Sequence, residues 1–76
     1  MNNARRKQLD EIHGKILELK EEIENVLDEE QDAYDSIPES LQNSDRADES
    51  LGAIDNMEYA IDSLDDALDY LSSVFD

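Results

Sequence analysis

The sequence contains no cysteine, one proline and two glycines among its 76 residues. Without cysteine, disulfides and thiolate metal sites are excluded, and a reducing compartment is expected. No apolar run approaches the roughly 20 residues that cross a membrane, and the opening MNNARRKQLDE lacks the apolar stretch of a signal peptide. These absences predict a cytoplasmic protein that does not contact membranes.

Basic residues are scarce as well: six stand against 22 acidic residues, and the formal net charge is −16. Residues 1–20 hold five of the six bases and carry a net charge of +2, while residues 21–76 hold 19 acids and one base. Such a surface repels nucleic acid and attracts basic proteins. A basic protein is therefore expected as partner, with no direct contact to nucleic acid.

Motifs of enzymes and of metal sites are also missing. The sequence has no HExxH, no glycine-rich phosphate loop and no Gly-x-Ser-x-Gly. The stretch DNMEYAIDSLDD lacks the central glycine and the ligand spacing of an EF-hand. The single histidine, His13, is expected to be a surface residue with an acidic neighbour rather than a catalytic base. We predict a non-enzymatic protein with no cofactor and no bound metal.

Apolar residues recur in steps of three and four along two stretches, which is the periodicity of amphipathic helices. The first run is Leu9, Ile12, Ile16, Leu19, Ile23, Val26 and Ala33, and the second is Ala47, Ile54, Met57, Ile61, Leu64, Leu68, Leu71 and Phe75. In heptad notation, Leu9 and Ile54 are a positions, and Ile12 and Met57 are d positions. Both runs therefore indicate helices of the coiled-coil type.

Helix boundaries are marked by proline and by capping residues. Pro38 lacks an N–H and disfavours helix at the residue before it, and residues 43–45 can cap a following helix. We predict one domain, residues 1–76, with a helix over about 4–36, a loop over about 37–44 and a helix over about 45–75.

The two runs match each other as an antiparallel pair when residues whose numbers sum to 80 face each other. Every layer is then apolar, and the polar exceptions, Glu30 and Ser50, meet in one layer. The predicted fold is all-α, an antiparallel two-helix coiled-coil hairpin. Because two helices bury little core, the hairpin is expected to dimerise into a four-helix bundle.

The flanking e positions extend this pairing, at residue numbers that sum to about 78. They are expected to pair His13 with Asp65, Lys20 with Glu58 and Leu27 with Leu51, which gives two contacts between opposite charges and one apolar contact. Such exposed pairs contribute only about 0.5 kcal/mol each, so they select the register more than they stabilise it.

The second helix carries its acids on one side. Aspartate returns every seven residues, and together with its acidic neighbours it forms an acidic strip with carboxylates roughly 5–6 Å apart. The acidic strip consists of Asp55, Glu58, Asp62, Asp65, Asp66 and Asp69. Tyr59 and Tyr70 are expected to face solvent and to anchor contacts, because tyrosine is enriched at interface hot spots. A charge run is usually a solvated face, but concentrated like charges cost stability, and binding to a basic protein explains them as well.

The opposite side of the second helix is a neutral flank. It consists of Ala53, Ala60, Ala67 and Val74. Small side chains let another helix approach closely, so this flank predicts a dimer seam. Docking of a different protein is the alternative.

Three stretches resemble small acidic hypothetical proteins of phages and prophages of Gram-positive bacteria: MNNARRKQLDEI, SIPESLQNSDRADES and AIDNMEYAIDSLDDALDYL. The resemblance spans nearly the whole chain. It implies a phage protein in the host-cell cytoplasm, and short acidic phage proteins include inhibitors of restriction, CRISPR and other defence systems.

Two functions are compatible with these patterns. The first is a phage-type inhibitor that binds a basic, nucleic-acid-binding host protein by mimicking nucleic-acid charge. The alternative is a structural assembly module that acts through self-association along the neutral flank.

Overall fold

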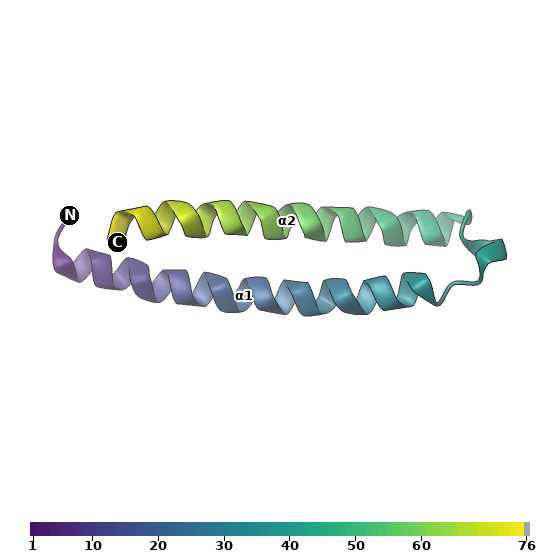
Figure 1. Cartoon of the computed structure of the whole chain (residues 1–76), viewed down its shortest axis with the longest axis horizontal. Helices are drawn as coiled ribbons and strands as arrows, with labels where there is room; N and C mark the ends of the chain where they lie inside the picture. Colours follow the sequence, from purple (N-terminus) through teal and green to yellow (C-terminus); the bar gives the residue numbers. More distant parts are fainter. Residues whose placement is uncertain (76) are drawn as a thin grey trace.

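Two long antiparallel helices form a rod that measures 59 × 15 × 14 Å along its principal axes. The computed structural model describes residues 1–75, so Asp76 lies outside the described residues. Helix α1 spans Asn3–Asp35, a short 3-10 helix spans Glu39–Leu41, and helix α2 spans Asp45–Phe75. The N-terminus and the end of α2 lie at one end of the rod, and the turn lies at the other (Figure 1). The predicted all-α architecture with two helices is confirmed.

Side-chain caps close three of the helix ends. The Asn2 side chain accepts a hydrogen bond from the backbone N–H of Arg5 at 2.8 Å and begins α1. Ser36 ends α1 by donating its hydroxyl to the carbonyl of Asp32 at 2.8 Å. Ser44, among the capping residues that the sequence suggested, accepts from the N–H of Ala47 and begins α2. These bonds satisfy backbone groups that a helix end otherwise exposes.

The seam between the helices buries few side chains. Ala47, Ile54 and Leu68 are its buried apolar residues, and all three belong to α2. Ser50 is also buried, and its hydroxyl donates to Glu30 Oε1 at 2.7 Å. The predicted meeting of the two polar positions is therefore observed, as a hydrogen bond between the helices.

The d positions of α1 differ from the prediction, because they do not close the seam. The exposed fraction is 43% for Ile12, 55% for Leu19 and 52% for Val26. Half-buried e positions take their place, among them Leu27 and Tyr34. Helix α1 is therefore rotated about its own axis, and its a and e positions face α2 while its d positions look outward. The rotation covers the large side chains of Leu27 and Tyr34.

The two predicted charge pairs of the e positions are wrong. Lys20 forms its ion pair with Asp65 rather than with Glu58, and His13 bonds to Ser72 Oγ at 3.2 Å rather than to Asp65. Both observed pairs sum to 85 instead of 78. Helical side chains lean toward the N-terminus of their own helix, so in an antiparallel pair they meet across a larger offset than spacing alone indicates.

His13 also differs from the predicted surface residue. It is half-buried, and its ring packs edge-on against Phe75 with 5.3 Å between ring centroids. Together with the bond to Ser72, this contact gives His13 a packing role where α1 begins beside the end of α2.

Candidate protein-interaction surfaces

The acidic strip lies on the outward side of α2. Five of its six members are exposed: Asp55, Glu58, Asp62, Asp66 and Asp69. Within residues 1–75 the ion pairs are those that Lys20 makes with Asp65 and Glu24, so these five carboxylates have no cation beside them. Like charges three and four residues apart repel each other along a helix. These five carboxylates therefore cost stability without any compensating ion pair inside the hairpin.

Asp65 is the member of the strip that has an internal partner. It is half-buried and receives the Lys20 ammonium group, which also lies 3.5 Å from Glu24 Oε1. The hydrogen bond to Asp65 raises the pKa of Lys20 above its ordinary value, against an opposing effect of desolvation. Asp65 thus belongs to the seam as much as to the strip.

The two tyrosines of α2 are strongly exposed, Tyr59 at 67% and Tyr70 at 77%. Tyr59 lies between members of the acidic strip in sequence, while Tyr70 lies beside the neutral flank. Eleven residues are about three helical turns, so the two rings lie on nearly the same side of α2, between the acidic strip and the neutral flank, and can anchor the same contact.

The neutral flank borders an apolar groove that runs along the seam. Ala53, Ala60 and Val74 are exposed, and Ala67 is half-buried. The groove has a volume of about 620 Å³ and lies between α1 and α2. It is lined by Leu19, Glu22, Ile23, Val26, Asn56, Met57, Ala60 and Leu64.

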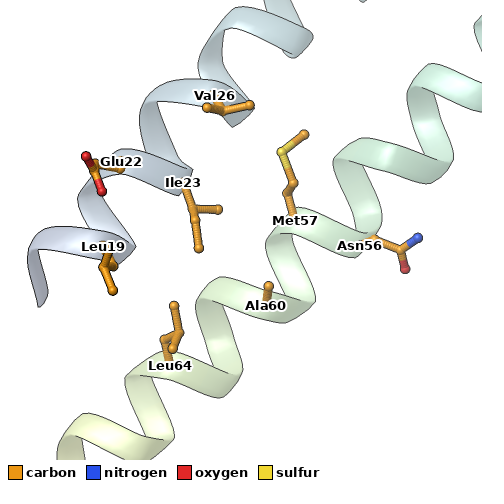
Figure 2. A pocket seen from close by; sticks show the side chains of 8 residues that line it. All are labelled: Leu19, Glu22, Ile23, Val26, Asn56, Met57, Ala60 and Leu64. Carbon is orange, nitrogen blue, oxygen red and sulfur yellow. The ribbon is translucent and has the colours of Figure 1, made fainter. Parts of the chain in front are cut away.

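Side chains of both helices form the floor of this groove (Figure 2). Ile23, Met57 and Leu64 point into the space between the helices, while Glu22 and Asn56 point away from it at the rims. The polar groups thus leave the floor apolar. On the helical wheel the groove side of α2 lies opposite the acidic strip, so the two surfaces can act independently.

Two residues that line this groove, Leu19 and Val26, were missed as interaction residues, and so was the exposed d position Ile12 farther along α1. The helical periodicity placed them in the closed seam of the hairpin. A signal was available in the e positions of α1, where Leu27 and Tyr34 are large enough to compete for burial. Because α1 can turn only one edge toward α2, its d positions stay exposed when the e positions are covered.

Other kinds of site find no support among residues 1–75. No group of three acidic or histidine side chains is arranged there to hold a metal ion. Neither α1 nor α2 is apolar enough over a sufficient length to cross a membrane. The acidic strip and the apolar groove are the interaction surfaces that the described residues support.

Comparisons with protein-family models, curated proteins and solved structures returned no match for this chain.

Proposed function

We propose that this protein is a non-enzymatic interaction module whose acidic strip binds a basic protein surface of the kind that binds nucleic acid. The observation that supports this proposal is the row of five exposed carboxylates without a cation beside them. Their spacing of roughly 5–6 Å is similar to that of phosphates along a nucleic-acid strand. Arginines and lysines that line a nucleic-acid groove would pair with the strip.

The resemblance to small acidic phage proteins suggests the class of partner. A basic host protein that binds nucleic acid, such as a restriction or CRISPR effector, would lose access to DNA or RNA when the strip occupies its groove. The chain would then act in the host cytoplasm as an anti-defence inhibitor.

A competition experiment tests this function. The immobilised chain first captures a protein from host lysate. The captured protein is then bound to a labelled DNA duplex, and free chain is added to measure how much duplex it displaces. The triple variant Asp55→Asn, Asp62→Asn and Asp69→Asn should bind about tenfold more weakly or worse, with a smaller dependence on salt.

A matched control lies on the outward side of α1. Glu21, Asp28 and Asp35 also recur every seven residues, and all three are exposed. Changing them to Gln, Asn and Asn removes the same charge and should leave displacement of the duplex nearly unchanged. An equal loss in both triple variants would show that net charge matters and the strip does not.

A second candidate function is a structural assembly module, favoured by the exposed apolar groove. In this case the hairpin would dimerise into a four-helix bundle, the neutral flank would lie in the dimer seam, and the acids would only solubilise the assembly. Large residues at Ala60 and Ala67 would then prevent self-association, whereas the triple change in the acidic strip would leave it intact.

A further inference from the structure

We infer that the apolar groove is the docking site of a second copy of this chain, packed with its turn at the opposite end of the rod. The inference rests on the self-association proposed above and deepens it by assigning the surface and the orientation. It is independent of the acidic strip, which lies on the other side of α2.

The first step is the exposed apolar area. Leu19 and Val26 expose more than half of their surface, although the periodicity of α1 places them on its apolar side. The buried apolar residues of the hairpin are few, and none of the side chains within residues 1–75 is both large and completely buried. A chain of this length with so small a core gains most from covering its open apolar side.

The second step is self-complementarity. The open side of α1 repeats Ile12, Leu19, Val26 and Ala33 at intervals of seven residues. A two-fold axis perpendicular to the rod can pass between Leu19 and Val26 and relate the second copy to the first. Leu19 then lies against the partner's Val26, and Ile12 lies against the partner's Ala33. Ala53 of the neutral flank then lies beside the partner's Ala60, where the two small side chains allow close approach.

The third step is charge, which decides the orientation. Residues 21–59 form the half of the rod that contains the turn, and they hold 14 acidic side chains and one basic side chain. The remaining residues hold eight acidic and five basic side chains. Turns at the same end would bring together two halves with a net charge of −13 each. With the turns at opposite ends, each such half lies beside a half with a net charge of only −3, so repulsion is far weaker.

The surface is tested by a matched pair of leucines on α1. Leu17 and Leu19 are both exposed, at 40% and 55%, but only Leu19 lines the groove. Sedimentation equilibrium should show a dimer for the wild-type chain and for Leu17→Asn. Leu19→Asn should dissociate at least about tenfold more readily, with its helical circular dichroism retained. A monomeric wild-type chain, or equal weakening by both changes, would overturn the inference.

The orientation is tested at the turn. The chain has no native cysteine, so Ser40→Cys provides a single exposed attachment point for a spin label. Two labels in the dimer should be separated by a distance approaching the 59 Å length of the rod. Labels close together would overturn the orientation while leaving self-association intact.

Salt separates this inference from the function of the acidic strip. Added NaCl screens repulsion between two acidic copies, so the dimer should become tighter. Binding of the acidic strip to a basic protein should become weaker under the same conditions. A dimer that dissociates on addition of salt would contradict the apolar groove as its contact surface, whatever the behaviour of the captured partner.

Discussion

Glu30 and Ser50 show how single polar residues can define the pairing of two helices. Each interrupts an otherwise apolar run, and they meet across the seam at 2.7 Å. A buried hydroxyl without an acceptor costs free energy, so any other register leaves Ser50 unfavourably placed. The pair therefore specifies the alignment more than it adds to the stability of the hairpin.

Changing one or both members of this pair should have opposite consequences. Glu30→Ala leaves the Ser50 hydroxyl without its acceptor and should lower the free energy of unfolding by about 1–2 kcal/mol. The double variant Glu30→Leu and Ser50→Ala removes both polar groups and should equal or exceed the wild type in stability. Urea unfolding followed by circular dichroism measures both values. If the unfolding free energy falls by a similar amount in both variants, the pair does not act by specifying the register of the two helices.

Lys20 provides a second test at the residue scale. In double-mutant cycles, Lys20→Met should couple with Asp65→Asn and should be additive with Glu58→Gln, because the ion pair joins Lys20 to Asp65. Unfolding free energies of the single and double variants measure the coupling. A coupling with Glu58 of equal size would instead support the pairing expected from residue spacing.

The raised pKa of Lys20 predicts a dependence on alkaline pH. Since the folded state holds this proton more tightly than the unfolded state, the stabilisation is complete at neutral pH. It is lost as the pH rises through the folded-state pKa of Lys20. The difference in stability between wild type and Lys20→Met should therefore shrink in that alkaline range.

At the scale of the helix, α1 faces α2 with a different edge from the one that its strongest apolar repeat suggests. The heptad pattern correctly assigned α1 and α2 as amphipathic helices, because periodicity is a local property of the chain. It could not assign the rotation of α1, since Leu27 and Tyr34 compete with the d positions for the same neighbour. The interaction surface was missed for the same reason.

The two helical glycines allow a prediction at this scale. A Cβ atom at Gly14 or Gly52 would have no neighbour within 4 Å, and both residues are exposed. Alanine has the higher helix propensity, so Gly14→Ala and Gly52→Ala should each raise the free energy of unfolding by about 0.5–1 kcal/mol. Thermal and urea unfolding measure the gain. A loss of stability at either site would indicate that a second molecule approaches the helix backbone there.

At the scale of the whole molecule, charge opposes the compact rod. The net charge of −16 is concentrated toward the turn, and five carboxylates of the acidic strip have no cation beside them among the described residues. Concentrated charge of one sign destabilises a folded chain through self-repulsion. The concentration of this charge on one face of α2 supports the proposed binding of a basic partner.

Screening this charge should stabilise the fold. Raising NaCl from about 20 mM to about 500 mM shortens the range of the repulsion, so the melting temperature should increase. The triple change in the acidic strip should make the increase smaller. Circular dichroism at fixed protein concentration measures both effects, and a melting temperature that falls with salt would contradict net repulsion.

The sequence by itself determined the two helices, the turn at Pro38 and the layer that joins Glu30 to Ser50, because helical periodicity and capping depend on residues close in the chain. It also determined the opposite placement of acidic and neutral side chains on α2. Only the tertiary structure decided that Lys20 meets Asp65 and that Leu19 and Val26 remain open. These features depend on the rotation of one helix against another and on the direction in which long side chains lean, and neither can be obtained from residue spacing alone.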